Sequence, residues 1–184
     1  PLALNFVGFQ LLWFVAVYGG AQGWGDAALA VLVVMQAGVW ALGRPWRRDL
    51  PLLCAGAFAC IVLEPVWMVP GLIHYQGWSY SWLAPGWIWA LWLGFAVSFN
   101  YCLAWLCGRP LMGMLAAVVT RSLLAALFGG IGGVISVTVG IRLGAATTPQ
   151  GWLPLALSYA AIWALVVPAL ALLAQRVNRS AARV

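Results

Sequence analysis

Charged side chains are the scarcest feature of this 184-residue sequence. Three acidic and nine basic residues make up 7% of the chain, whereas a soluble domain carries about 25% charged residues. Because so few polar groups cannot cover a globule in water, the composition excludes a soluble domain. Hydrophobic residues account for 65% of the chain, and they form unbroken runs instead of the alternating pattern of a membrane β-barrel. The sequence therefore predicts an all-α integral membrane protein in one transmembrane domain, 1–184.

Lysine is absent and histidine occurs once, which narrows the function further. All nine basic residues are arginines placed between apolar runs, so nucleic-acid binding is not expected. The four cysteines form no CxxC motif, and one histidine is too few for a typical metal site. The single histidine also leaves no Ser-His-Asp set. We expect no metal and no evident cofactor, although a bound lipid or apolar pigment is compatible with the composition.

Six apolar runs are long enough to be read as membrane spans. They cover residues 4–18, 27–42, 50–68, 87–106, 122–141 and 152–174. Arginines gather on one side of this arrangement, which predicts N-in and C-in orientation in a bacterial inner membrane. The predicted inner side holds Arg44, Arg47, Arg48, Arg109, Arg176, Arg179 and Arg183. The outer side holds Arg142 alone.

Two connections do not read as simple loops. Residues 107–121 are too apolar for an ordinary loop, so we predict an interfacial or re-entrant segment there. Residues 69–86 are rich in Trp, Tyr, Pro and Gly, and they predict an interfacial aromatic belt or a short re-entrant segment on the outer side.

Glu64 is the acidic residue that lies inside an apolar run, directly before Pro65. A carboxylate in hydrocarbon is costly unless it is paired or wet, so it marks a candidate functional site. Two hypotheses stay open: a structural ion pair with Arg142, or a titrating or catalytic carboxylate in an outward-facing cavity. The predicted polar pocket around Glu64 comprises Ser136, Arg142, His74, Trp67 and Trp92.

A second polar set is predicted nearer the inner side. It comprises Asn5, Gln10, Gln36 and Asn100. Interhelical hydrogen bonds are the ordinary role of such amides in membranes, with about 0.6 kcal/mol per bond on average. Small residues recur at helical spacing in the fifth run and predict close helix packing there. They are Gly129, Gly133, Gly140 and Gly144.

Three passages together resemble a known family. They read NFVGFQLLWF, LWLGFAVSFNYCLAWL and GGIGGVISVTVGIRLGA. They are similar to the small bacterial inner-membrane proteins of domain of unknown function twenty-eight seventy-eight. The matching positions are Asn5, Gln10, Trp13, Leu91, Trp92, Phe95, Asn100 and Arg142 to Ala145. The family usually has an Asp where this chain has Glu64. The resemblance implies fold and location, and it implies no activity.

The sequence favours a non-enzymatic function, because it has almost no extramembrane part and no evident catalytic machinery. We predict an accessory or structural subunit of a membrane complex, or a small transporter-like protein, with membrane lipid and other membrane subunits as partners. The alternative is a lipid- or isoprenoid-binding protein or enzyme. In that case Glu64 would act as general acid, with Trp67, Trp89 and Trp92 around an apolar ligand.

Overall fold

A computed structural model describes residues 1–107 and 114–181 of the chain. Within these residues the fold is all-α, as predicted, with six α-helices. They are α1 (Leu2–Gln22), α2 (Ala27–Ala41), α3 (Leu50–Met68), α4 (Gly86–Ser98), α5 (Met114–Arg142) and α6 (Trp152–Ala181). A short 3-10 helix, η1 (Trp46–Arg48), precedes α3, and another, η2 (Ala104–Cys107), follows α4.

Four helical segments are long and apolar enough to cross a membrane, judged by length and composition. They are Leu2–Gln22, Trp46–Met68, Arg121–Arg142 and Trp152–Arg179. The helices α2 and α4 are apolar but shorter. Large hydrophobic side chains such as Val34, Phe58 and Leu165 remain exposed on the outside of the bundle. An apolar exterior of this kind suits a helix bundle surrounded by lipid.

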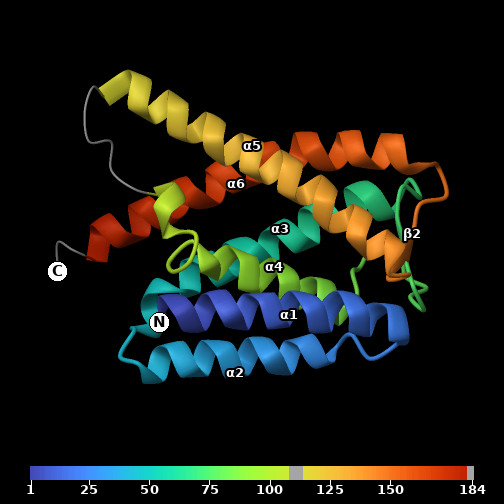
Figure 1. Cartoon of the computed structure of the whole chain (residues 1–184), viewed down its shortest axis with the longest axis horizontal. Coiled ribbons are helices and arrows are strands. Elements are labelled where there is room, and N and C mark those ends of the chain that lie inside the picture. Colours follow the sequence, from blue (N-terminus) through green and yellow to red (C-terminus); the bar gives the residue numbers. More distant parts are fainter. Residues whose placement is uncertain (108–113, 182–184) are drawn as a thin grey trace.

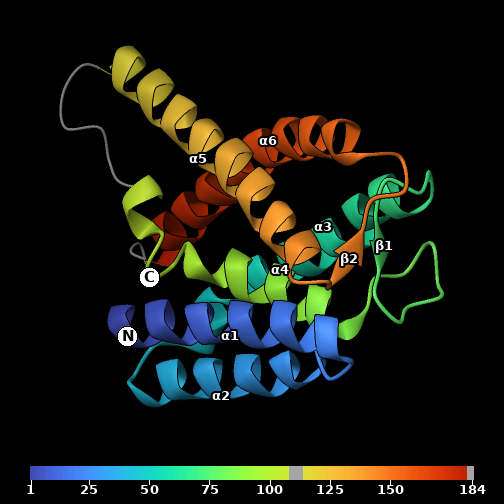
Figure 2. The same cartoon turned by 45° about the vertical axis from the view of Figure 1, so that its right-hand side comes forward.

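The helices pack in sequence-neighbouring pairs, α1 with α2, α3 with α4 and α5 with α6 (Figure 1). The α1–α2 pair lies on one side, α5 and α6 lie on the other, and α3 and α4 run between them (Figures 1 and 2). The N-terminus and the C-terminal end of α6 lie at the same end of the bundle (Figure 1). Two buried clusters of hydrophobic side chains fill the interior, one toward each end.

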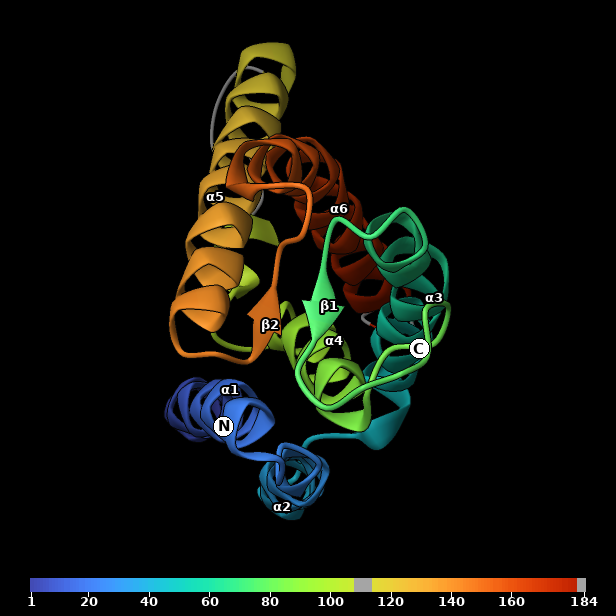
Figure 3. The same cartoon turned by 90° about the vertical axis from the view of Figure 1, so that its right-hand side faces the viewer.

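A two-stranded sheet closes the opposite end of the bundle (Figure 3). Strand β1 (His74–Tyr75) pairs antiparallel with β2 (Ala146–Thr147), so that Tyr75 faces Ala146. The N–H of Gln76 extends the ladder by donating to the carbonyl of Ala145 at 2.9 Å. The sheet therefore joins the α3–α4 connection to the α5–α6 connection. The segment 69–86, for which an interfacial aromatic belt or a short re-entrant segment is predicted, contributes strand β1 to this sheet.

Helix α4 ends earlier than predicted, at Ser98 instead of residue 106. The Ser98 hydroxyl donates to the carbonyl of Gly94, and the chain then turns through Phe99 and Asn100. This turn carries Asn100 and Tyr101 to the carboxylate of Asp49, at 2.8 and 2.7 Å. These long-range hydrogen bonds to Asp49 form where α4 ends. Apolar composition alone did not predict this end of the helix.

Helix α5 begins earlier than predicted and α6 continues further. Residues 114–120 belong to the same continuous helix as the fifth predicted span, not to a separate interfacial or re-entrant segment. The rest of that predicted segment includes residues 108–113, which lie outside the described residues. Helix α6 runs through Pro168 without interruption and extends to Ala181.

Glycines set how closely the helices approach. A Cβ on Gly129 would lie 2.2 Å from the carbonyl oxygen of Trp163, and one on Gly133 would lie 2.6 Å from the Trp163 ring, so both need glycine against α6. Gly140 faces α1 instead, with Val17 at 3.8 Å from its would-be Cβ. Gly144 lies beyond the helix at φ +86°, where glycine suits the turn and not helix packing. The four predicted packing glycines therefore divide among three roles.

Candidate functional site

Glu64 lies near the C-terminal end of α3 and is 3% exposed. Its two carboxylate oxygens accept hydrogen bonds from different elements. The Tyr75 hydroxyl in β1 donates to Oε2 at 2.6 Å, and the Trp92 indole N–H in α4 donates to Oε1 at 2.7 Å. Two neutral donors thus hold the carboxylate in one position.

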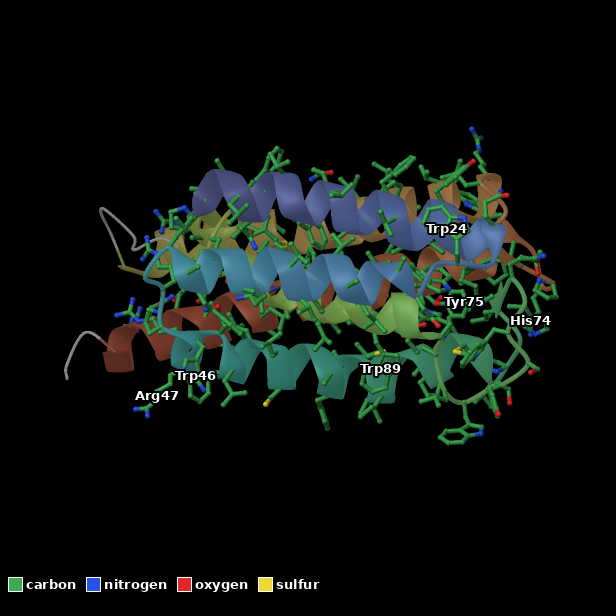
Figure 4. The ribbon with its side chains drawn as sticks, turned by 90° about the horizontal axis from the view of Figure 1, so that it is seen from below. Trp24, Trp46, Arg47, His74, Tyr75 and Trp89 are labelled. Atoms are coloured by element: carbon green, nitrogen blue, oxygen red, sulfur yellow. The ribbon has the colours of Figure 1, made fainter. Side chains whose placement is uncertain are left out.

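Local structure brings these two donors to Glu64. Gly56 in α3 lies against the backbone of α4, where an added Cβ would be 2.8 Å from the carbonyl oxygen of Trp92. The close approach of α3 and α4 places the Trp92 side chain beside α3. Pairing of β1 with β2 turns Tyr75 into the bundle, whereas His74 lies at its margin (Figure 4). Burial and the neighbouring Glu64 carboxylate raise the pKa of Tyr75 well above its usual range, so its hydroxyl remains a donor.

Glu64 borders a cavity of about 260 Å³ among α1, α3, α4, α5, α6 and the sheet. Most of its wall is aromatic or aliphatic. Helices α1 and α4 contribute side chains such as Phe9, Trp13, Trp87 and Leu91. Helix α5 contributes Gly129, Gly132, Gly133 and Gly140 together with the side chains of Phe128, Ser136 and Val137. Gly132 and Gly140 leave open space beside the helix, whereas Gly129 and Gly133 are packed against α6.

Stacked aromatic rings form the wall next to Glu64. Trp92 stacks on Trp163 with ring centroids 4.7 Å apart and planes 10° apart. Phe95 meets Trp163 edge-on at 5.2 Å. The Trp163 indole nitrogen is buried and makes no hydrogen bond to the described residues. The cavity wall therefore contains one buried donor without a described acceptor.

A hydrogen bond between α1 and α5 crosses the boundary of the cavity. The Trp13 indole N–H donates to the hydroxyl of Ser136 at 3.0 Å. On the same helix α5, Gly132 and Phe128 both line the cavity and are exposed on the molecular surface. No heavy atom lies within 4 Å of a would-be Cβ on Gly132. The cavity thus reaches the apolar outside of the bundle along α5.

The structure brings together only part of the predicted pocket. Ser136 and Trp92 line the cavity with Glu64. Trp67 is fully buried behind it, where it stacks with Tyr159 at 4.2 Å and donates to the Ser158 hydroxyl at 3.0 Å. Trp89, which was predicted to contact an apolar ligand, is only half-buried. Its indole N–H donates to the carbonyl of Ala84 at 3.2 Å.

The expected ion pair between Glu64 and Arg142 is wrong. Arg142 is exposed at the C-terminal end of α5, and Glu64 is bound by Tyr75 and Trp92 instead. His74 is also exposed and does not reach the cavity. The error arises because equal depth along two helices does not place their side chains on facing sides.

A second buried carboxylate, Asp49, lies at the opposite end of the bundle and is fully buried. Four side-chain donors surround it. They are Gln36 at 2.5 Å, Tyr101 at 2.7 Å, and Trp40 and Asn100 at 2.8 Å. Burial and this carboxylate raise the pKa of Tyr101, so its hydroxyl also remains a donor. The cluster links α2, the start of α3 and the turn after α4.

Asp49 lies between the predicted spans 27–42 and 50–68, and the sequence alone did not predict this cluster. Of the predicted inner polar set, Gln36 and Asn100 do bind Asp49. Asn5 is also fully buried, and its side-chain oxygen accepts a hydrogen bond from the backbone N–H of Cys102 at 3.4 Å. Gln10 is exposed and joins neither group. The sequence did contain a signal for it. The side-chain N–H groups of Gln36, Trp40 and Asn100 lie in the inner half of the membrane-spanning region, and each needs a hydrogen-bond acceptor.

The two acids differ in what they can still bind. A carboxylate offers about four acceptor positions. Asp49 accepts from four side-chain donors, three on Oδ2 and one on Oδ1, whereas Glu64 accepts from two donors and faces a cavity. In the described residues no group of three or more His, Cys, Asp or Glu side chains could hold a metal ion. The chemistry available at Glu64 is therefore acceptance of a hydrogen bond from a molecule in the cavity.

Fold and site together define a helical bundle of membrane type with an aromatic cavity and one buried carboxylate in its wall. A family model described as "Protein of unknown function (DUF2878)" matches residues 2–123 and 113–169. The chain belongs to this family, as its resemblance in sequence implied. No curated protein and no solved structure matches the chain.

Proposed function

We propose that the protein binds a lipid-like molecule in the cavity beside Glu64, with its apolar part against the aromatic wall. The observation that carries this proposal is a cavity of about 260 Å³ whose wall is almost entirely apolar but includes a buried carboxylate. Ligand pockets commonly combine an apolar lining with a few placed polar groups. An apolar cavity of about 150 Å³ already holds benzene, so this one has room for a ring or part of a chain.

The opening along α5 supports entry from the membrane. Gly132 and Phe128 line the cavity and also reach the exterior, where neighbouring side chains such as Ile131 and Ile135 are apolar and exposed. A molecule dissolved in the bilayer would meet this opening between α1 and α5 without crossing water. The part of its chain that exceeds the cavity would extend into the lipid.

Glu64 serves in this proposal as an acceptor that orients the ligand, not as a general acid. Both of its oxygens accept hydrogen bonds, which suits an ionised carboxylate. We rank ligand binding ahead of an accessory-subunit function because that function does not account for the cavity. A transporter-like function would itself require a ligand to bind there. The apolar cavity thus supports membrane lipid as the binding partner.

We further propose a multi-pass protein of the inner membrane with both termini inside. Support comes from the arginine distribution and from the placement of both ends of the chain. Trp46 and Arg47 lie at the same end as the N-terminus and the C-terminal end of α6 (Figure 4). The sheet with His74 and Tyr75 lies at the other end, which would face outward.

Photolabelling tests the proposed binding. The protein in lipid nanodiscs is exposed to hexadecanol carrying a diazirine on its chain, and labelled peptides are mapped by mass spectrometry. We expect label on cavity segments of α1, α4 and α5. Gly140→Leu should abolish most of this label, because Gly140 lines the cavity and a larger side chain would occupy it.

The matched control is Leu123→Phe, which adds bulk to an exposed position of the same helix away from the cavity and its opening. It should leave the labelling pattern unchanged. Label spread evenly over the lipid-facing surface, or equal cavity labelling in Gly140→Leu and the wild type, would contradict ligand binding in the cavity.

A further inference from the structure

Glu64 brings a negative charge into the cavity wall, and no basic side chain there balances it. Its two donors, the Tyr75 hydroxyl and the Trp92 indole N–H, are both neutral. Among the described residues that line the cavity, none is an arginine or a histidine. Arg142 is exposed at the end of α5. Because a charge buried without a counter-charge is costly, a positively charged ligand would be stabilised in this cavity.

Aromatic rings adjoin this charge on both of its oxygens. Tyr75 meets Trp87 edge-on, with ring centroids 5.2 Å apart. Trp92 stacks on Trp163 at 4.7 Å. The first ring of each pair donates to a different oxygen of Glu64, and all four side chains line the cavity. Aromatic rings attract cations to their negative faces, and aromatic cages bind ammonium ligands in this way.

The cavity also has one polar end and one apolar end. Tyr75 of strand β1 binds Glu64, which places the carboxylate toward the sheet end of the bundle (Figure 4). Along α5 the lining extends from Gly140 to Phe128, a rise of about 18 Å for a helix. Phe128 and Gly132 are exposed on the apolar outside of the bundle. This arrangement suits a ligand with a charged head and a hydrocarbon chain.

Charge discriminates among the head groups that such a ligand could carry. A carboxylate or a phosphate would meet the like charge of Glu64. A hydroxyl group can donate a hydrogen bond to the carboxylate, but it brings no charge. An ammonium group donates and also supplies the counter-charge, and a charge-assisted hydrogen bond is about twice as strong as a neutral one.

We infer that the ligand is an amphiphilic ammonium ion, whose charged head binds Glu64 and whose hydrocarbon chain extends along α5 toward the lipid. This inference rests on the proposed ligand binding and names the class of molecule that the same site selects. Tyr75 and Trp92 then hold the carboxylate in position for the cation. Glu64 is the residue that determines the specificity for charge.

A head-group series tests the inference on the wild-type protein, which avoids any question of folding. Three diazirine probes share one hexadecyl chain and end in a primary ammonium, a hydroxyl or a carboxylate group. The protein is labelled in nanodiscs of zwitterionic lipid, and labelled residues are mapped by mass spectrometry.

Cavity label is divided by the label on α2, which corrects for the amount of each probe in the bilayer. Val33 and Val34 of this helix are exposed, and none of the described α2 residues lines the cavity. We expect the relative cavity label of the ammonium probe to be about tenfold that of the alcohol, because an ion pair is added to the hydrogen bond. The carboxylate probe should give the lowest value.

Glu64→Gln assigns this preference to the carboxylate, because it removes the charge and keeps the size of the side chain. The advantage of the ammonium probe over the alcohol should fall below about threefold, since only attraction to the aromatic rings remains. Labelling of the variant by the alcohol reports that the cavity is intact. Asp26→Asn is the control, because it removes the same charge from an exposed position outside the cavity and should leave the preference unchanged.

The outcomes separate the two proposals. Equal relative cavity label for the ammonium and the alcohol probes in the wild type would overturn the ammonium inference and leave ligand binding intact. An undiminished ammonium preference in Glu64→Gln would also overturn the inference. Failure of every probe to label the cavity above the level on α2 would overturn ligand binding itself.

Discussion

The two buried carboxylates of this protein occupy opposite ends of the bundle and have different surroundings. Asp49 is fully buried and accepts hydrogen bonds from four side chains that come from α2 and the turn after α4. Glu64 is buried to almost the same degree, yet it accepts from two side chains and borders a cavity. Burial is alike at the two sites, and only the number of donors and the adjoining space differ.

This difference separates a structural carboxylate from one that can bind a ligand. Four donors from α2 and from the turn after α4 converge on Asp49, which does not line the cavity, so this carboxylate holds helices together. A carboxylate with unused positions beside empty space can gain a further hydrogen bond, so Glu64 can recognise a ligand. The number of donors around a buried acid is thus more informative about function than its burial.

The largest expected effect is loss of stability when Asp49 loses its charge. Asp49→Asn replaces an acceptor oxygen by an NH₂ donor in front of Gln36, Trp40, Asn100 and Tyr101, and leaves several of them unpaired. We expect the free energy of unfolding to fall by about 3 kcal/mol, as for a broken buried charge network. Denaturation of the protein in mixed micelles, followed by tryptophan fluorescence, measures this change.

Asp26→Asn is the matched control for that measurement. Asp26 precedes α2, is exposed and makes no side-chain cap hydrogen bond. Its replacement should change the free energy of unfolding by less than about 0.5 kcal/mol. Equal stability of the Asp49→Asn and Asp26→Asn proteins would show that the Asp49 cluster does not hold the bundle together.

A smaller effect is expected from the two tyrosines that donate to these acids. Tyr75→Phe and Tyr101→Phe each remove one hydroxyl from a carboxylate and keep the ring. Each should lower the free energy of unfolding by about 1.5 kcal/mol, the lower range for a hydrogen bond to a charged group. The same denaturation measurement gives both values.

Added hexadecanol should distinguish the two variants. In Tyr75→Phe an alcohol in the cavity can donate to the oxygen that Tyr75 has released, so part of the lost stability should return. Asp49 and Tyr101 do not line this cavity, so the alcohol should restore no stability in Tyr101→Phe. Equal recovery in both proteins, or recovery in neither, would remove the functional distinction between the two acids.

Local sequence signals were sufficient for much of the fold. The third predicted span, 50–68, coincides with α3 (Leu50–Met68) because Asp49 and Pro51 mark its start and Pro70 with Gly71 marks its end. Hydropathy also singled out Glu64, since a carboxylate is conspicuous in an apolar run. These features depend on residues that are close in sequence.

Long-range contacts were beyond the same reasoning. Tyr75 reaches Glu64 because β1 pairs with β2, about seventy residues further along the chain. Asp49 looked like a loop residue because its donors reach it only when α2 and the turn after α4 pack against the start of α3. The cavity likewise depends on which faces of α1, α4 and α5 meet, which hydropathy does not specify.

The smallest expected effect concerns Arg142, which depth along the helices had suggested as the partner of Glu64. Arg142 is exposed in the last turn of α5, where a cation gains a modest interaction with the helix terminus. Arg142→Ala should therefore change the free energy of unfolding by no more than about 0.5 kcal/mol. In a double-mutant cycle with Glu64→Gln, measured by the same denaturation, the two effects should add. A coupling energy above about 1 kcal/mol would restore the ion pair, and Glu64 would then be a second structural acid like Asp49.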